Sequence, residues 1–127
     1  MDLERFYQES DYISLHLPAS VQTQGMINAE VLARMKQGVY LINTARGDLI
    51  DENALLAALQ SGHIGGAGLD AFVHEPFTDE RFWGLSNVLL TPHSGSYTAE
   101  AVERTLIAAA QEVLRVLNQE KPLYAVE

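Results

Sequence analysis

The sequence contains no cysteine, so the chain can form no disulfide, offer no thiolate nucleophile and bind no metal through sulfur. Positive charge is also scarce: 8 lysines and arginines face 17 aspartates and glutamates, which gives a formal net charge of −9 at pH 7. Nucleic acids and anionic membranes are bound through clustered Lys and Arg. We therefore predict no nucleic-acid partner and no membrane partner, and we attribute the acidity to solubility.

Long apolar runs are missing as well. No stretch approaches the roughly 20 residues of a membrane helix, and the start, Met1 to Phe6, lacks the basic and then apolar pattern of a signal peptide. The default expectation is a cytoplasmic protein. With 127 residues, 47 % of them hydrophobic, the chain is expected to fold as one domain covering residues 1–127.

The glycine-rich turn G-x-G-x-x-G, which opens a complete dinucleotide-binding domain, is absent. Gly65, Gly66 and Gly68 have a different spacing and lead to the end of a strand instead of into a helix. A strand of such small residues indicates the close approach of a neighbouring backbone or of a ligand.

What the sequence does contain is a regular alternation of strands and helices. Apolar runs predict strands at 12–15, 39–43, 64–70 and 88–90, and helical patterns occupy 2–9, 29–35, 52–60, 78–85 and 98–118. Asn28, Asp51 and Thr98 are the expected N-caps. Alternation of this kind favours right-handed βαβ units. We predict an α/β fold with a parallel sheet of about four strands, flanking helices and a long C-terminal helix.

Two sets of apolar side chains have an expected role in packing. In the last helix the stripe runs through Val102, Leu106, Ala109 or Ala110, Val113 and Leu117. The aromatic side chains Tyr12, Phe72, Phe77, Phe82 and Trp83 are most simply interpreted as core or loop packing.

Chemically useful residues follow three of the predicted strands. The strand 39–43 runs through Thr44 and Ala45 to Arg46 and Gly47, where a glycine suggests a backbone conformation closed to other residues. Asp70, with Glu75 after it, ends the next strand, and His93 follows the last. Ligands of parallel sheets bind at the carboxyl ends of the strands. A cation, carboxylates and an imidazole are therefore expected on one rim.

These segments resemble the D-isomer-specific 2-hydroxyacid dehydrogenases, an NAD-dependent family. The resemblance runs in order along nearly the whole chain, through Ser10 to Pro18, Thr23, Gly25, Ile27-Asn28, Asn43 to Gly47, Gly68 to Asp70, Glu75-Pro76 and Thr91 to His93. It implies a Rossmann-like sheet of which only the second half is present. The substrate domain and the first half, with its G-x-G-x-x-G turn, are missing from this sequence.

The resemblance also implies catalytic roles. Arg46 corresponds to the residue that binds the substrate carboxylate and keto oxygen, His93 to the acid/base, and Glu75 to the carboxylate that bonds the other nitrogen of the His93 ring. The residues themselves leave simpler interpretations open: a surface arginine at a helix entrance, a histidine satisfied by backbone in a loop, and an exposed loop glutamate.

For the cofactor, the resemblance implies NAD and assigns it to the same rim. Asp70 corresponds to the residue that binds the nicotinamide carboxamide, although a turn-capping role fits it nearly as well. The remaining implied cofactor contacts are Pro18, Thr44, Ala45, Arg46, His93, Ser94 and Gly95. NADP is not excluded, because the acidic residue that reads the ribose belongs to the missing half. The identity of the 2-hydroxy or 2-oxo acid lies in the missing substrate domain.

A metal site is the other interpretation that the histidines invite. His74 lies four residues after Asp70 and next to Glu75, but zinc needs further converging ligands. Nothing in the sequence supplies a third, and we predict no metal.

Two functions remain. The chain is either part of a 2-hydroxyacid dehydrogenase, inactive alone and complemented by another chain, or a non-catalytic interaction module or inactive fragment. In a complete sheet the strand Tyr12–Leu15 pairs with the missing glycine-turn strand. Alone it forms an apolar edge, which is a template for self-association or for a complementing chain.

Overall fold

The computed structural model describes residues 2–125. Its elements, in chain order, are α1 (Leu3–Glu9), β1 (Tyr12–Leu15), α2 (Ala29–Arg34), β2 (Val39–Asn43), the 3₁₀ turn η1 (Gly47–Leu49), α3 (Glu52–Gln60), β3 (Ile64–Leu69), α4 (Glu80–Trp83), β4 (Val88–Leu90) and α5 (Ala99–Leu117). The described residues divide into two compact units, with the division between His93 and Ser94. The first unit holds the sheet and the second holds α5.

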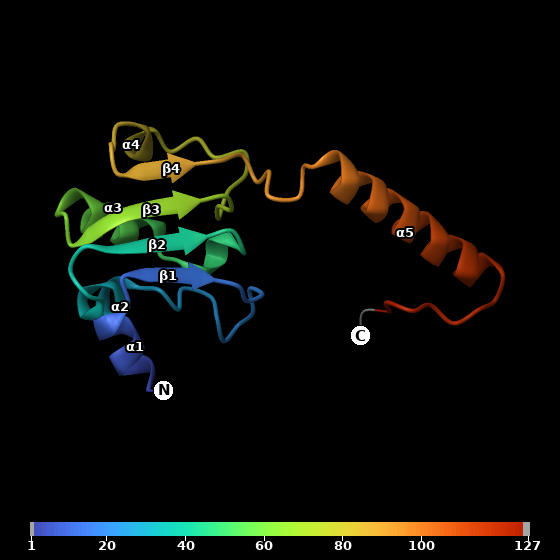
Figure 1. Ribbon diagram of the computed structural model, residues 1–127, viewed down its shortest axis with the longest axis horizontal. Helices are drawn as coiled ribbons and strands as arrows, with labels where there is room; N and C mark the ends of the chain where they lie inside the picture. The colour runs from blue at the N-terminus through green and yellow to red at the C-terminus, as the bar shows by residue number, and fades with distance from the viewer. Residues whose placement is uncertain (1, 126–127) are drawn as a thin grey trace. The chain divides into compact units, whose positions relative to one another are not determined.

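All four strands of the first unit lie in one parallel sheet, in the order β1-β2-β3-β4. The strand arrows in Figure 1 therefore point the same way, and their carboxyl ends share one edge of the sheet. β1 is an edge strand within this sheet. The expected α/β fold with a parallel sheet and a long C-terminal helix is confirmed.

The helix boundaries follow local capping chemistry. The Asp51 carboxylate accepts the Asn53 and Ala54 amides at the start of α3, and the Asn28 side chain accepts the Val31 amide at the start of α2. The Thr98 hydroxyl does the same for Ala101 in α5. Each such cap is worth about 1 kcal/mol. The three expected N-caps are therefore confirmed.

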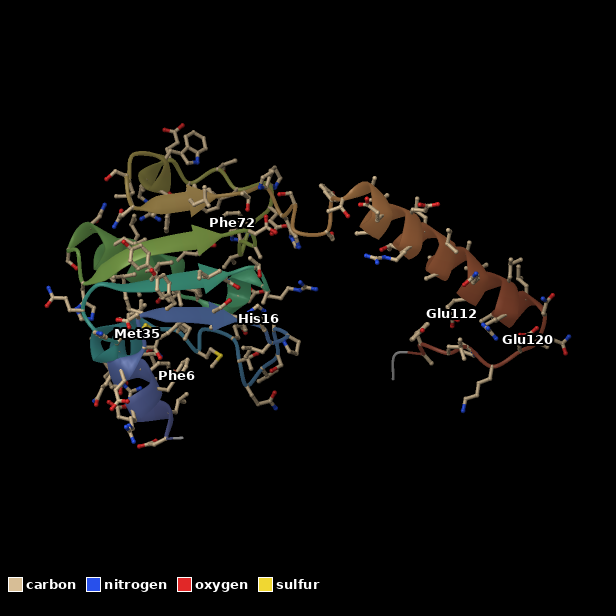
Figure 2. All side chains as sticks on the ribbon, viewed as in Figure 1. Phe6, His16, Met35, Phe72, Glu112 and Glu120 are labelled. Atoms are coloured by element: carbon tan, nitrogen blue, oxygen red, sulfur yellow. The ribbon has the colours of Figure 1, made fainter. Side chains whose placement is uncertain are left out.

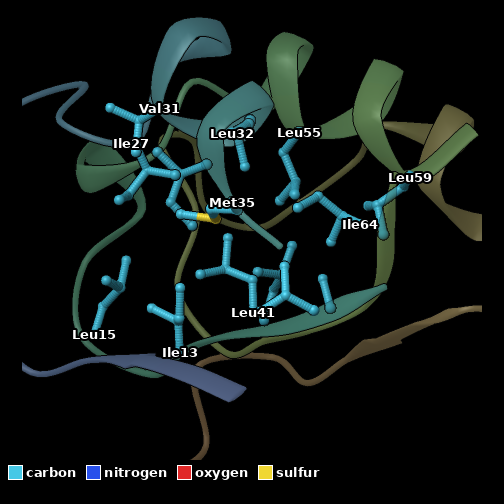
Figure 3. Close-up of a cluster of buried hydrophobic side chains, with 14 of the residues drawn as sticks. Ile13, Leu15, Ile27, Val31, Leu32, Met35, Leu41, Leu55, Leu59 and Ile64 are labelled. Carbon is cyan, nitrogen blue, oxygen red and sulfur yellow. The ribbon is translucent and has the colours of Figure 1, made fainter. Parts of the chain in front are cut away.

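The core lies on one face of the sheet. Ile13, Leu15 and Leu41 from the strands face α2 and α3, and Figure 3 shows them meeting Leu32 and Leu55 from these helices. The other large side chains of this core include Ile27, Val31, Met35, Leu59 and Ile64. Burial of each such side chain contributes roughly 1.5–3 kcal/mol. The strands and the two crossover helices are thus held as one layer on another.

The opposite face of the sheet is open in the described residues. Tyr12 is 68 % exposed and Tyr40 48 %, and their rings stack with centroids 5.5 Å apart across β1 and β2. Leu89 on β4 is also 68 % exposed. Tyr12, interpreted from the sequence as core or loop packing, is instead an exposed strand residue. Trp83 also lies outside the core, with 58 % of its surface exposed, whereas Phe72 and Phe82 are buried.

Gly47 is needed for a different reason from the one expected. Its backbone is not in the left-handed region, which among the described glycines holds only Gly25, Gly38 and Gly62. A side chain at Gly47 would instead place Cβ 2.0 Å from the carbonyl carbon of Phe72. Absence of a side chain, and not backbone freedom, lets η1 lie against the segment after β3.

The ends of five elements differ from the sequence predictions. α1 begins one residue later than predicted, at Leu3, and α5 is one residue shorter at each end, at Ala99–Leu117. α2 stops at Arg34, and Met35 follows as the buried C-cap residue. α4 spans only Glu80–Trp83, because Asp79 supplies the cap and Gly84 follows. β3 ends at Leu69, which leaves Asp70 just beyond the strand.

α5 is described by itself. No α5 residue is buried, and Leu106, Val113 and Leu117 of the expected stripe are 66 %, 59 % and 72 % exposed. The expected stripe is therefore an exposed apolar face of α5 within the second unit. The segment after the helix turns back along it, and Figure 2 labels Glu112, whose carboxylate accepts the Leu123 amide at 2.8 Å.

Candidate functional site

The carboxyl edge of the sheet gathers the expected site residues of the first unit. Pro18 follows β1, Thr44 to Arg46 follow β2, Asp70 follows β3 and His93 follows β4. Because parallel strands end at the same edge, one topological feature places all of them on one rim. Ser94 and Gly95 come directly after His93 in the chain but belong to the second unit.

The turn that carries Arg46 is shaped by Asn43, the last residue of β2. The buried Asn43 side chain accepts the Ala45 amide at 3.1 Å and donates to the Arg46 carbonyl at 2.8 Å. These bonds satisfy a buried amide side chain and fix the turn. The Arg46 guanidinium is exposed and donates to the Ala45 carbonyl at 2.7 Å. Asn43 was not singled out from the sequence, although a polar residue ending an apolar strand is a visible signal.

Asp70 is held by backbone and by a hydroxyl. Its amide donates to the Asn43 carbonyl at 2.9 Å, and its Oδ1 accepts the Thr91 hydroxyl at 2.6 Å. The residue is 5 % exposed. A carboxylate so buried needs hydrogen-bond donors to stay charged. Thr91, another residue that the sequence did not single out, supplies one of them.

Glu75 and His93 are in direct contact. The Nδ1 atom of His93 lies 2.9 Å from Oε1 and 2.9 Å from Oε2 of Glu75. The expected contact between these two residues is therefore confirmed. Oε1 also accepts the Phe72 amide at 3.0 Å. The two residues are 18 positions apart in the chain, and they come together because Glu75 follows β3 and His93 follows the neighbouring strand β4.

The backbone of His93 is itself unusual. Its φ is 52°, in the left-handed region that non-glycine residues seldom occupy, and its amide donates to the Thr91 carbonyl at 3.0 Å. Such a conformation costs on the order of 1 kcal/mol and persists when surrounding contacts fix it. Strained residues of this kind cluster at functional sites.

The electrostatics of the contact set the protonation pattern. The hydrogen bond from His93, and then the one from the Phe72 amide, lower the pKa of Glu75 below its usual value of 4.5, and loss of hydration and, less strongly, the nearby Asp70 oppose the change. Glu75 is therefore ionised at neutral pH and can only accept. Nδ1 of His93 then carries the proton, which leaves Nε2 as the ring atom for proton transfer.

A pocket of about 270 Å³ adjoins this contact. Glu75 and His93 line it together with Phe77, Trp83 and Leu90. Phe77 stacks on Phe72 with ring centroids 4.1 Å apart, so the wall is aromatic and well packed. The arrangement offers a charged pair beside an apolar hollow of the size of a small ligand.

Two further hydrogen bonds involve residues in and after β1. The Pro18 carbonyl accepts the Thr23 hydroxyl at 2.8 Å, and Pro18 and Thr44 are both exposed. His16, labelled in Figure 2, has its Nε2 2.8 Å from the Ser14 hydroxyl.

Among residues 2–125 no three histidine or acidic side chains gather so as to hold a metal ion. None of the described helices is long and apolar enough to cross a membrane.

Comparison with known proteins identifies a family and solved structures that this chain is similar to. Residues 1–95 match the family described as "D-isomer specific 2-hydroxyacid dehydrogenase, NAD binding domain". A hydroxypyruvate reductase from Thermotoga maritima is 46 % identical over 121 residues, which cover 93 % of this chain and 40 % of the reductase. Measured over the curated relatives, the chain spans from about a fifth to two fifths of their length.

Two solved structures have the same fold over nearly the whole chain. A D-lactate dehydrogenase with NAD⁺ from Lactobacillus jensenii has a TM-score of 0.90 and 31 % identity, over 100 % of this chain and 42 % of that one. A D-isomer specific 2-hydroxyacid dehydrogenase from Xanthobacter autotrophicus Py2, in complex with NADPH and MES, has a TM-score of 0.82 and 37 % identity, over 98 % and 51 %. The sheet and its helices are thus those of a Rossmann-type NAD-binding domain.

Proposed function

This chain belongs to the NAD-binding-domain family of the D-isomer-specific 2-hydroxyacid dehydrogenases, and on that premise we propose that it serves an NAD(H)-dependent oxidoreductase acting on a 2-hydroxy or 2-oxo acid. The observation that carries the proposal is the Glu75–His93 contact at the carboxyl edge of the sheet. We propose further that residues 1–127 all belong to one partial NAD-binding domain.

His93 acts as the acid/base in this proposal. Glu75 accepts the Nδ1 proton at 2.9 Å and so fixes both the tautomer and the ring orientation. Nε2 then gives a proton to the oxygen of a 2-oxo acid as it is reduced, and takes it back in the oxidation. An imidazole is suited to both directions because its ordinary pKa is near neutrality.

Arg46 binds the substrate carboxylate in the proposal. Its guanidinium is exposed at the end of β2 and donates to the Ala45 carbonyl of its own turn. A planar cation of this kind binds carboxylate with two parallel hydrogen bonds. The Asn43 side chain holds the Arg46 backbone and so presents the guanidinium at the rim.

The residues at the rim fit the nicotinamide half of the cofactor, which supplies or accepts the hydride when bound. Thr44 and Ala45 are small, and Pro18 is exposed after the end of β1, the strand that pairs with β2. Asp70, anchored by Thr91, is the proposed partner of the carboxamide. Ser94 and Gly95 complete the proposed contacts. Solved relatives contain NAD⁺ or NADPH, so we propose NAD without excluding NADP.

Turnover by this sequence alone is not expected. It contains no G-x-G-x-x-G turn to hold the pyrophosphate, and it matches only part of each relative. We propose that the first half of such a domain, with its glycine-rich turn, completes the site.

The test is NADH binding to the purified chain by calorimetry, with circular dichroism to confirm folding. We expect weak saturable binding that Asp70→Ala reduces at least about fivefold, since it removes a charge-assisted hydrogen bond. Asp11→Ala is the matched control, because Asp11 precedes β1 at the opposite end of the strand and pairs with Lys36. Absence of binding by a folded chain would contradict the proposal.

A non-catalytic interaction module or inactive fragment is the second candidate. It is favoured by one observation: β1 is the edge of the sheet, beside an open face that carries Tyr12 and Tyr40. An exposed edge recruits another strand. A folded chain that fails to bind NADH but associates through β1 would favour this function.

A further inference from the structure

The segment between β3 and α4 carries Glu75. Two consecutive backbone amides of this segment donate hydrogen bonds to carboxylates. The Phe72 amide donates to the Glu75 carboxylate at 3.0 Å, within the segment itself. The next amide, of Val73, donates instead to Oε1 of Glu52 at 3.0 Å. Glu52 belongs to α3, 21 residues earlier in the chain. The segment is thus tied both to itself and to a different element.

α3 is a rigid anchor for this bond. Glu52 is its first residue, and the preceding Asp51 caps the helix through two amides. Leu55, Leu56 and Leu59 of the same helix are buried in the core. The Glu52 carboxylate is therefore held by an element that is itself fixed by packing, as a supporting side chain must be.

The geometry points to Glu52 as a positioning residue for the Glu75–His93 pair. Among the hydrogen bonds of residues 2–125, Glu52 has none to His93, and its bond to the Val73 amide is the link to the segment that carries Glu75. By holding Val73 it sets the path of the chain from Phe72 to Glu75, and so the direction in which the Glu75 carboxylate meets the imidazole. Its catalytic meaning rests on the proposed function, whereas the positioning itself does not.

Reach and charge of Glu52 can be separated by two substitutions. Glu52→Gln removes the charge but keeps an Oε1 acceptor at the same length. Glu52→Asp keeps the charge but is one methylene shorter, so the bond to Val73 at 3.0 Å is lost. Glu30→Gln is the matched control, since Glu30 occupies the first turn of α2 as Glu52 does that of α3.

The readout is the pKa of Glu75, followed by carbon-13 NMR of side-chain carboxyls in the whole chain. Hydrogen bonds from His93 and Phe72 lower this pKa, and loss of hydration and then Asp70 oppose them. We expect Glu52→Asp to raise it by roughly half a pH unit as the contacts loosen. Glu52→Gln and Glu30→Gln should leave it at the wild-type value. The measurement needs neither cofactor nor substrate, so its failure is distinct from failure of the proposed function.

The opposite pattern overturns the inference. If Glu52 acted through charge alone, Glu52→Gln would lower the pKa of Glu75 and Glu52→Asp would leave it unchanged. Should Glu52→Asp not fold, hydrogen exchange in the wild-type chain decides. If the Val73 amide exchanges at least about tenfold more slowly than the random-coil rate for this amide, the hydrogen bond to Glu52 is supported. Exchange at the random-coil rate contradicts it.

Discussion

At the scale of single residues, the candidate site depends on side chains that hold one another. His93 sits at a φ of 52° with its ring against Glu75, Glu75 is held by Phe72, and Asp70 by Thr91. None of these pairs is close in sequence except Phe72 and Glu75. The arrangement is therefore produced by the sheet, which brings the ends of β3 and β4 together.

The Glu75–His93 contact predicts a dependence of stability on pH. The pKa of Glu75 is lowered on folding, so between the folded and unfolded pKa values the unfolded chain binds more protons. The contribution of Glu75 is fully present above its usual value of 4.5 and is lost as pH falls through the lower folded pKa. We expect wild type to be more stable than Glu75→Gln near neutrality, with the difference vanishing on acidification.

Urea unfolding, followed by fluorescence of the single tryptophan at several pH values, measures this difference. Asp79 also has a lowered pKa, because the Arg81 guanidinium bonds it, so both proteins lose stability in acid for that shared reason. A stability difference between wild type and Glu75→Gln that grew on acidification would show that the assigned direction is wrong.

At the scale of elements, the sequence predicted those boundaries that are set by residues close to them in the chain. β1, β2, α3 and β4 have the predicted bounds, because apolar runs and side-chain caps within a few residues determine them. The turn η1 and the role of Gly47 could not be predicted. They depend on the backbone at Phe72, which lies 25 positions along the chain and marks no local pattern. At the site, the charged residues and the histidine could be identified from the sequence. Asn43, Thr91 and Glu52 could not, because they act through contacts that exist only in the folded chain.

The close approach of η1 to Phe72 gives a prediction for this element. In Gly47→Ala the new Cβ would lie 2.0 Å from the Phe72 carbonyl carbon, so backbone must move. Overpacking of this kind costs about 3 kcal/mol. The control is Gly84→Ala, where no heavy atom lies within 4 Å and φ is −84°. Urea unfolding should show a large loss for the first and almost none for the second; equal stability would mean that η1 and the segment after β3 are not in contact.

At the scale of the whole molecule, we propose that the edge strand β1 determines how copies of the chain associate. β1 pairs with β2 on one side only among the described strands. Its alternating burial places Tyr12 and Ser14 on the open face, where the Tyr12 ring stacks on Tyr40. Natural edge strands are protected by charge, proline or a covering element. The strand Tyr12–Leu15 contains neither charge nor proline.

We therefore expect the chain to self-associate through β1, and the association to weaken when charge is placed there. In sedimentation velocity, the wild-type coefficient should rise with concentration, whereas Tyr12→Lys should sediment as a monomer over the same range because a lysine at an edge opposes strand addition. Tyr97→Lys is the matched control, since Tyr97 is 75 % exposed and belongs to the second unit. It should associate like wild type. A wild-type coefficient that does not change with concentration would remove the edge as an association site between copies.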